Sequence, residues 1–292
     1  MQNFIQKTMM RNENFAAFIL THGRPDSVKT FSALKRSGYT GRIYLIVDDE
    51  DSTIDEYKKK YGNQVIVFSK EKISKTFDQA DNFTDRRSIV YARNACFEIA
   101  KNLNIRYFIQ LDDDYSSFSY KFDKDLNQKE RGIKQLDKVF DTILDYYIEI
   151  PALTIAMAQG GDFLGGEQGR FKKSLHLMRK AMNSFFCDTQ RPFKFLGRIN
   201  EDVNTYTNLG SKGGLFLTIP NVKISQQTTQ KNKGGMTELY LESGTYIKSF
   251  YTIMFNPSSV KISEMGEKNR RIHHNINWNN TVPCIIEEKY KK

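Results

Sequence analysis

Between residues 15 and 111 the sequence alternates short apolar segments with longer amphipathic ones. The apolar segments have the length and composition of buried strands, and the segments between them have those of helices. This alternation predicts a parallel sheet with right-handed crossovers and helices on its faces. The predicted strands are 15–20, 42–47, 64–68 and 107–111, and the predicted helices lie at about 26–37, 53–61 and 86–103.

Three of the four predicted strands end in polar or acidic residues. In chain order, the candidate residues at these ends are Thr21, His22, Arg24, Asp48, Asp49, Asp112, Asp113 and Asp114. Ligands of open parallel sheets bind beyond the carboxyl ends of the strands. We therefore expect these side chains to gather at one edge of the sheet, around a bound ligand.

The run of three aspartates after residue 111 indicates a metal-dependent enzyme. Carboxylates at the end of a buried strand are costly to desolvate without a compensating cation. Mg2+ and Mn2+ prefer oxygen ligands and keep positions open for phosphate oxygens. Because alternate side chains of an extended segment share a face, Asp112 and Asp114 would point at one metal, or at a metal and a ribose. The alternative is a solvated acidic turn, and the neighbouring clusters favour the metal site.

Residues around this run are candidates for binding a phosphorylated donor. Arg93, on the helix that leads to the aspartates, would clamp a diphosphate, unless it is a surface arginine. His22 or Arg24 would contact phosphate or base. Asp48 or Asp49 would accept a hydrogen bond from a base or a ribose, the alternative being a solvated acidic loop.

The second half of the chain has a weaker pattern. It predicts a helix at 133–147, a short helix opening at 198–203, and strands at 152–158 and 215–219. It also predicts mobile polar loops at 160–166 and 226–235, and a segment at 246–255 that reads as either helix or strand. No segment has the composition of a linker. We therefore expect one domain with a donor-binding half at about 15–125 and an acceptor-binding half at about 126–292.

Two further pairs in this half are candidates for chemistry. Glu201 and Asp202 would supply a general base that deprotonates an acceptor hydroxyl, although acids at a helix start also suit the helix dipole. His273 and His274 would supply a nitrogen ligand to a divalent ion, the alternative being a surface or core pair.

The net charge favours a polyanionic partner. With 44 Lys and Arg against 34 Asp and Glu, the chain carries +10, which is typical of nucleic-acid binding, the alternative being a solvated basic surface. The candidate contacts to a DNA backbone are Lys172, Lys173, Arg179, Lys180, Lys231 and Lys233. The first residues contain no apolar signal core, and no stretch approaches the length of a membrane span. Three widely spaced cysteines match neither a zinc site nor a CxxC pair. We expect a reduced cytoplasmic protein with no membrane partner.

Taken in order, these motifs resemble those of GT-A glycosyltransferases. The resemblance lies in THGR after the first strand, DDE after the second, YARNA before DDD, then NED and a late HH. More narrowly, the chain resembles the TET-associated glycosyltransferases of bacteriophages. The stretches that carry this resemblance are FILTHGRPDSVKT, GYTGRIYLIVDDED, YARNACFEIAKNL, YFIQLDDDY, GTYIKSFY and PSSVKI with RIHHNINW. The resemblance implies a Rossmann-like α/β fold with a mixed, largely parallel sheet flanked by helices.

It also implies an activity and roles for the residues. Members attach sugars to 5-hydroxymethylpyrimidines in DNA, a modification that protects phage DNA from host restriction. A nucleotide-sugar, in our expectation a UDP-sugar, would be the donor, with Mn2+ or Mg2+ as cofactor and 5-hydroxymethylcytosine as the expected base. Asp112 and Asp114 match the D-x-D motif, Glu201 and Asp202 the base motif, and either His273 or His274 the late metal ligand. The role of Asp113 stays open, and we group it with the donor-binding residues.

Other functions remain compatible with parts of this pattern. A GT-A enzyme acting on protein, glycan or a small molecule would keep the D-x-D motif but would not need the +10 charge. A nucleotidyltransferase also uses paired acids with a metal, and would release pyrophosphate. An inactive binding module would be expected to lose the acids of the metal site, all of which are present.

Overall fold

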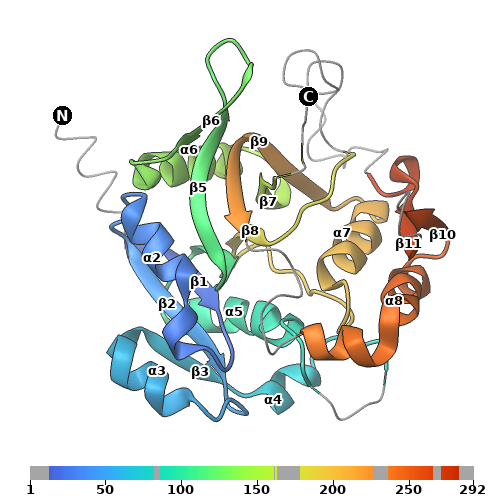
Figure 1. The fold of residues 1–292 in the computed structure, drawn as a ribbon, viewed down its shortest axis with the longest axis horizontal. Helices are drawn as coiled ribbons and strands as arrows, with labels where there is room; N and C mark the ends of the chain where they lie inside the picture. Colours follow the sequence, from blue (N-terminus) through green and yellow to red (C-terminus); the bar gives the residue numbers. More distant parts are fainter. Residues whose placement is uncertain are drawn as a thin grey trace.

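A large mixed sheet with helices on both faces forms the body of the molecule, and a small two-stranded sheet lies beside it (Figure 1). The structure, a computed structural model of the chain, describes residues 13–81, 86–160, 162, 178–226, 236–265 and 271–282, and only the backbone of 236–245. The α/β class predicted from the sequence is confirmed.

The large sheet has the strand order β3-β2-β1-β4-β8-β7-β9-β5-β6. Its strands are β1 (Phe15–Leu20), β2 (Arg42–Asp48), β3 (Val65–Phe68), β4 (Tyr107–Asp112), β5 (Tyr115–Phe122), β6 (Gln128–Gly132), β7 (Ala152–Ala158), β8 (Ser184–Asp188) and β9 (Leu215–Gln226). β1 pairs in parallel with β2 and β4, and β2 with β3, so the carboxyl ends of these four strands lie at one edge. Antiparallel β8 separates this parallel part from the rest of the sheet.

The helices divide between the two faces according to the alternation of strand side chains. They are α2 (Lys29–Arg36), α3 (Ile54–Tyr61), α4 (Lys70–Ser74), α5 (Val90–Asn102), α6 (Leu136–Glu149), α7 (Glu201–Ser211) and α8 (Met236–Phe255). Ala17 and Ile19 of β1 pack in one buried cluster with residues of α2, α3 and α6. Phe18 and Leu20 point to the opposite face and pack with α5 and α7. Each face of the sheet therefore has its own apolar core.

The predicted strands of the first half match the observed ones within about one residue, whereas the second half departs further from the prediction. The segment 246–255 is the end of the long helix α8, and the strand at 215–219 continues to residue 226. β5, β6, β8, α4 and the small sheet of β10 (Val260–Met265) and β11 (Arg271–Ile276) were not predicted. β6 illustrates the reason: all five of its residues are exposed, so it carries no apolar pattern.

Several predicted features fall outside the described residues. These are most of the loop 160–166, residues 227–235 of the second loop, and Lys172, Lys173, Lys231 and Lys233. Among the helices that the structure describes, none combines the length and apolar character needed to cross a membrane.

Candidate active site

Asp113 joins the ends of the first and fourth strands of the chain. Its side chain is buried, and its Oδ2 accepts a hydrogen bond from Thr21 Oγ1 at 2.7 Å. Arg24 Nη2 lies 3.1 Å from its Oδ1. Burial raises the pKa of Asp113 to about 6, although the Arg24 charge acts in the opposite direction. Asp113, to which the sequence motif assigned no role, therefore connects the polar residues after β1 with the acids after β4.

Arg93 of α5 connects Asp112 with Glu201. Its Nη2 donates to Asp112 Oδ1 at 2.9 Å, and its Nε donates to Glu201 Oε1 at 3.0 Å. The guanidinium is 4.9 Å from the ring centre of Phe185 and 5.7 Å from that of Phe195, and the residue is only 2% exposed. A buried cation needs such paired acids to offset its desolvation. Two acidic motifs that lie far apart in the sequence are thus brought together through one arginine.

Asp114 is the acid of the run whose charge is least compensated. Its Oδ1 is buried and has no hydrogen-bond partner among the described residues. Burial is the main cause that raises the pKa of Asp114 to about 7, and repulsion from Asp112 and Asp113 adds to it. Arg93 and Arg24 pair with Asp112 and Asp113, whereas an unpartnered carboxylate oxygen such as that of Asp114 is a ligand that suits Mg2+ or Mn2+. The residues present therefore fit the divalent metal expected from the sequence.

Glu201 and Asp202 begin α7 and are almost completely buried. Asn200 precedes them in the left-handed conformation, with φ of 55°, and its Nδ2 donates to the carbonyl oxygen of Lys248 on α8. Burial and the neighbouring Asp202 charge raise the pKa of Glu201 to about 7. Burial also raises the pKa of Asp202, while Lys248 is one of the cations that oppose this shift. An acid with a raised pKa suits proton transfer near neutral pH.

Asp48, at the end of β2, has protein partners on both carboxylate oxygens. His22 Nδ1 lies 2.7 Å from its Oδ2, and Lys70 Nζ lies 2.9 Å from its Oδ1. Burial acts to raise the pKa of Asp48, but the bonds from His22 and Lys70 hold it below its usual value. The hydrogen bond with Asp48 raises the pKa of His22. This group is a closed ion-paired cluster at the edge of the sheet.

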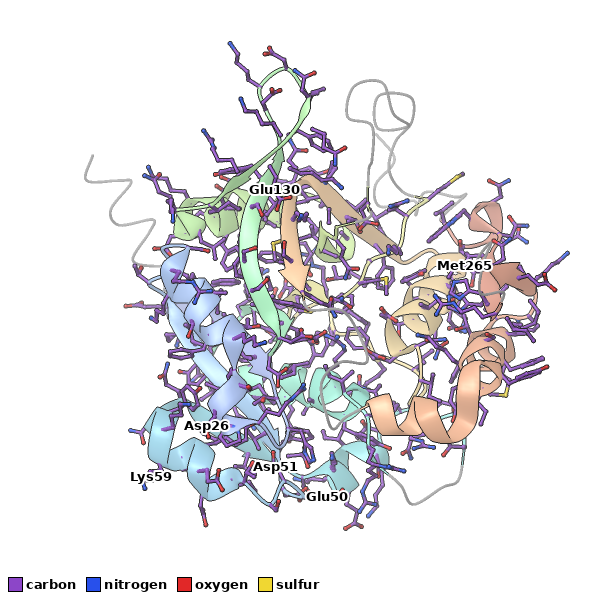
Figure 2. The ribbon with its side chains drawn as sticks, viewed as in Figure 1. Asp26, Glu50, Asp51, Lys59, Glu130 and Met265 are labelled. Carbon is purple, nitrogen blue, oxygen red and sulfur yellow. The ribbon has the colours of Figure 1, made fainter. Side chains whose placement is uncertain are left out.

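The other acids of this loop are also bonded within the protein. Asp51 accepts hydrogen bonds from the backbone nitrogens of Gly23 at 2.6 Å and Thr53 at 2.8 Å. Asp49 Oδ1 accepts from the backbone nitrogen of Lys70 at 2.9 Å. Figure 2 shows Asp51 and Glu50 close together at this corner of the molecule. The acidic run after β2 therefore fastens the loops after β1 and β3 to each other.

His273 and His274 lie on β11, in the small sheet. Their rings stack with centres 4.3 Å apart, and the neighbouring cations are Lys248 and Arg271. Burial lowers the pKa of both histidines, that of His274 to about 4. Within the described part of the chain, no group of three or more histidine, cysteine or acidic side chains is arranged around a common metal position. The structure does not bring either histidine into such a group with Asp112 and Asp114, and their ligand role stays a prediction.

A sequence profile of the TET-associated glycosyltransferases matches residues 15–235. The chain belongs to this family. The matched region contains the strand ends of β1, β2 and β4 and the acids of α7, whereas the two histidines lie beyond it. No curated protein matches the sequence.

Solved glycosyltransferases resemble this family member only distantly. The mannosyltransferase PcManGT from Pyrobaculum calidifontis is 10% identical, with a TM-score of 0.45 over 75% of this chain and 58% of that one. S. aureus TarS is 12% identical, with a TM-score of 0.46 over 75% of this chain and 37% of that one. Glucosyl-3-phosphoglycerate synthase from Mycobacterium tuberculosis is 9% identical, with a TM-score of 0.44 over 93% and 90%. The chain thus spans 58% and 37% of the lengths of the first two.

Three residues of this candidate site were not singled out in the sequence. Lys70 neutralises Asp48, and Lys248 approaches the acids of α7. Tyr57 of α3 accepts from the Arg24 backbone nitrogen at 2.9 Å and shares a 2.7 Å hydrogen bond with Thr21. Of these three residues, only Lys248 could have been suspected from the sequence, because it lies in the stretch GTYIKSFY that resembles the family.

Proposed function

We propose that this glycosyltransferase transfers a sugar from a nucleotide-sugar, expected to be a UDP-sugar, to the hydroxyl of a 5-hydroxymethylpyrimidine in DNA. The expected base is 5-hydroxymethylcytosine. One observation carries the proposal: Asp112, whose charge acts on the uncompensated Asp114, is linked through Arg93 to Glu201 of the buried Glu201–Asp202 pair. Family membership supports sugar transfer, and the +10 charge supports a polyanionic acceptor.

On the donor side, the proposal assigns the acids of β4 to the metal and the diphosphate. Asp112 and Asp114 would hold Mn2+ or Mg2+, which neutralises the charge of a diphosphate leaving group. Arg93 keeps Asp112 oriented, and Arg24 does the same for Asp113. The partly exposed His22 borders the same sheet edge, where it would contact the base or ribose of the donor, and Asp48 would hold its ring in place.

On the acceptor side, Asp202 is the proposed base. Glu201 is held by Arg93, whereas the only hydrogen bond described for the Asp202 carboxylate comes from the adjacent backbone nitrogen of Val203. The acceptor hydroxyl oxygen forms a bond to the anomeric carbon, its proton passes to Asp202, and the bond from that carbon to the diphosphate breaks. The nucleoside diphosphate leaves with the electron pair. This scheme applies to an inverting transfer; for a retaining transfer neither Asp202 nor Glu201 would be assigned as the base.

The proposal keeps two further assignments from the sequence. The donor half at about 15–125 contains the ends of β1, β2 and β4, and the acceptor half at about 126–292 contains α7. His273 or His274 would complete the metal shell, an assignment that the arrangement of the described residues supports least.

Mass spectrometry of nucleosides tests this function directly. DNA duplexes with 5-hydroxymethylcytosine, 5-hydroxymethyluracil or neither are incubated with the protein, Mn2+ and a panel of nucleotide-sugars. We expect a sugar-sized mass gain only on a hydroxymethylated base, abolished by Asp114→Ala and retained by Asp55→Ala, a matched change at an exposed acid of α3. Metal-dependent hydrolysis of a donor without any DNA product would instead move the acceptor to a protein, a glycan or a small molecule.

A further inference from the structure

Asn200 is the residue of the NED motif that the proposed function leaves without a role. It is the N-cap of α7, directly before Glu201 and Asp202, and is 7% exposed. An asparagine at this position usually has extended dihedral angles, and its side chain bonds a backbone nitrogen of the first helical turn. Asn200 does neither, because its φ and ψ are 55° and 39° and its side chain caps none of the backbone nitrogens of α7, all of which the structure describes. Helix capping therefore does not account for this residue.

The left-handed conformation of Asn200 is costly, and the segment before it holds the chain in place. Residues with a side chain enter this region rarely, and such strain persists where the surroundings impose it, often at functional sites. Arg198 Nη2 lies 2.8 Å from Asp81 Oδ2, and both side chains are largely buried. Ser88 Oγ donates to the Arg198 carbonyl oxygen at 2.6 Å. Residues between α4 and α5 thus fix the path along which the chain enters α7.

The side chain of Asn200 joins the start of α7 to α8. Its Nδ2 donates to the carbonyl oxygen of Lys248 at 2.5 Å and to Thr252 Oγ1 at 3.2 Å. Thr252 is fully buried, so water does not compete for this amide. Burial raises the pKa of Asp202, and the charge of Lys248 is among those that oppose this shift. The amide of Asn200 therefore fixes the part of α8 whose cation acts on the proposed base.

The backbone of Asn200 sets the direction of the acids that follow it. Glu201 accepts from Arg93 Nε at 3.0 Å, and Arg93 Nη2 donates to Asp112 at 2.9 Å. Because Glu201 is the next residue, any change in the dihedral angles of Asn200 would turn the first residues of α7 away from Arg93. A displacement of about 1 Å in a catalytic group can lower a rate by about 100-fold.

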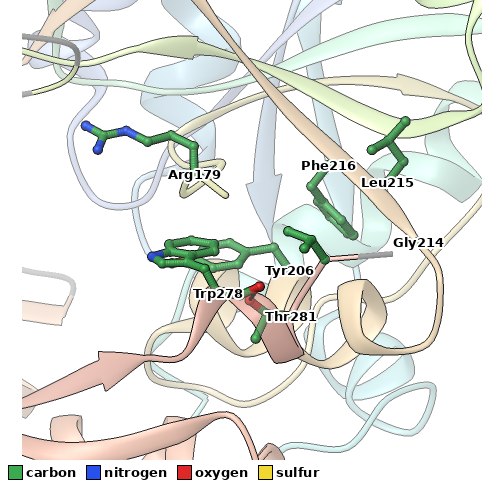
Figure 3. A pocket seen from close by; sticks show the side chains of 8 residues that line it. Arg179, Tyr206, Gly214, Leu215, Phe216, Trp278 and Thr281 are labelled. Atoms are coloured by element: carbon green, nitrogen blue, oxygen red, sulfur yellow. Dashed lines mark hydrogen bonds between the residues drawn. The ribbon is translucent and has the colours of Figure 1, made fainter. Parts of the chain in front are cut away.

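The remainder of α7 is held by packing that does not involve Asn200. Tyr206 stacks on Trp278 with ring centres 5.7 Å apart (Figure 3). Nearer the end of the helix, a side chain at Gly210 would collide with the carbonyl oxygen of Thr281, so the two segments are in close contact. Loss of the Asn200 side chain is therefore expected to disturb the first turn of α7 while the helix stays in place.

We propose that Asn200 is a positioning residue for sugar transfer: its left-handed backbone directs Glu201 and Asp202 into the site, and its amide keeps Lys248 of α8 beside them. Asn200 acts through the acids and contacts no reacting atom. This inference rests on the proposed function, in which the acidic pair supplies the base.

Two substitutions separate the contributions of the amide and the backbone. Glycine adopts the left-handed conformation freely, so Asn200→Gly removes only the amide. We expect its kcat to fall about 10-fold, with the KM values for donor and DNA within about 2-fold of the wild type. Asn200→Ala also disfavours the left-handed backbone, and its kcat should fall about 100-fold. An unchanged kcat in both variants would overturn the proposal.

Asn208→Ala is the matched control. Asn208 lies two turns further along α7, and its Nδ2 donates to the carbonyl oxygen of Phe255 of α8 at 3.1 Å. This bond is a second tie between the same two helices, away from the acids. Asn208→Ala should lower Tm by a similar amount to Asn200→Gly but change kcat by less than about 2-fold. An equal loss of kcat in the control would show that Asn200 only stabilises the fold.

A double-mutant cycle distinguishes positioning from a general loss of structure. If Asn200 acts only through the acids, adding Asn200→Gly to Asp202→Asn should lower kcat by less than about 2-fold further, because the base is already absent. A role in overall stability predicts instead that the two losses multiply, and that outcome would contradict the proposal.

The two proposals fail in different ways. If DNA is glycosylated but the Asn200 variants keep the wild-type kcat, the positioning role is wrong and the proposed function stands. If no nucleoside gains mass with any donor, the proposed function is wrong, and hydrogen exchange at Arg93 Nε, measured by NMR, still tests the positioning role. The bond from this N–H to Glu201 should open more readily in Asn200→Gly, with exchange about 10-fold faster than in the wild type or in Asn208→Ala. Equal exchange rates in the three proteins would overturn the positioning role independently of activity.

Discussion

The ends of β2 and β4 lie on either side of β1, and both are acidic, but their charges are balanced in different ways. At β2, Asp48 is bonded to His22 and Lys70, and its pKa is lowered. At β4, burial and like charges raise the pKa of Asp114 to about 7, and one of its oxygens has no partner among the described residues. The same pattern of acids after a strand is therefore neutralised by the protein at β2, whereas at β4 one oxygen of Asp114 stays without a partner among the described residues.

The largest expected effect is on catalytic activity, and it distinguishes the acid after β4 from the acid after β2. We expect Asp114→Asn to lower kcat/KM by about 1,000-fold or more, because a metal typically contributes several kcal/mol to transition-state stabilisation. Asp48→Asn should lower it by only about 10-fold, mainly through the donor KM. Steady-state kinetics with varied Mn2+ measures both, and similar losses for the two variants would contradict the distinction.

A second comparison concerns the two acids of α7. Asp202→Asn should reduce kcat by about 100- to 10,000-fold with little change in KM, the usual contribution of a general base. Glu201→Gln keeps a hydrogen-bond acceptor for Arg93 and should reduce kcat less. A larger loss for Glu201→Gln would exchange the roles of the two acids. Donor hydrolysis in the absence of DNA separates loss of the base from loss of donor binding.

Smaller, opposite effects on stability are expected without divalent metal. At pH 8, Asp114→Asn removes a buried, repelled carboxylate and should raise Tm by roughly 3–6 °C, corresponding to about 1–2 kcal/mol. Asp48→Asn breaks a buried ion pair and should lower Tm by a similar amount. Added Mn2+ should raise the Tm of the wild type and leave that of Asp114→Asn nearly unchanged, as scanning calorimetry would report.

The smallest effect is a pH dependence of stability in metal-free protein. The pKa values of Asp113, Asp114 and Glu201 are raised to about 6, 7 and 7, so the folded state keeps protons that the unfolded state releases. Their contribution to stability is full below pH 4 and is lost as pH rises to about 7. Asp48 has the opposite sign, because its lowered pKa favours the folded state above pH 4. Urea unfolding of wild type and Asp114→Asn measures the free energy of unfolding between pH 5 and 8. Over this range it should change by about 1 kcal/mol less in the variant than in the wild type.

The gathering of the polar clusters was predictable from sequence, because parallel strands place their carboxyl ends at one edge. Thr21 and Arg24 indeed meet Asp113 there. The distinct roles of the three aspartates were not predictable, because β4 ends at Asp112 and β5 begins at Tyr115. Asp113 and Asp114 therefore lie in a turn, where the alternation of side chains along a strand no longer applies.

Residues that arrive from distant segments were hidden for a different reason. Lys70 lies in a stretch that looks solvated, and Lys248 lies in a family-like stretch that does not reveal its partner, so only the three-dimensional arrangement places them beside Asp48 and Asp202. β8 was not predicted as a strand, and its place between β4 and β7 was equally hidden, because local periodicity does not give the neighbours of a strand in a sheet. What the sequence conveyed well was local geometry, and what it lacked was the long-range pairing of charges and strands.

The neighbours of β4 have a consequence for how the protein is made. One side of this strand pairs with β1, synthesised about ninety residues earlier, and the other pairs with β8, which leaves the ribosome more than seventy residues later. Until then the strand that carries the aspartates has an open edge, exposed to other chains. We therefore expect a fragment ending near residue 125 to aggregate although it keeps every motif proposed for the donor, so the proposed donor and acceptor halves could not be separated by truncation.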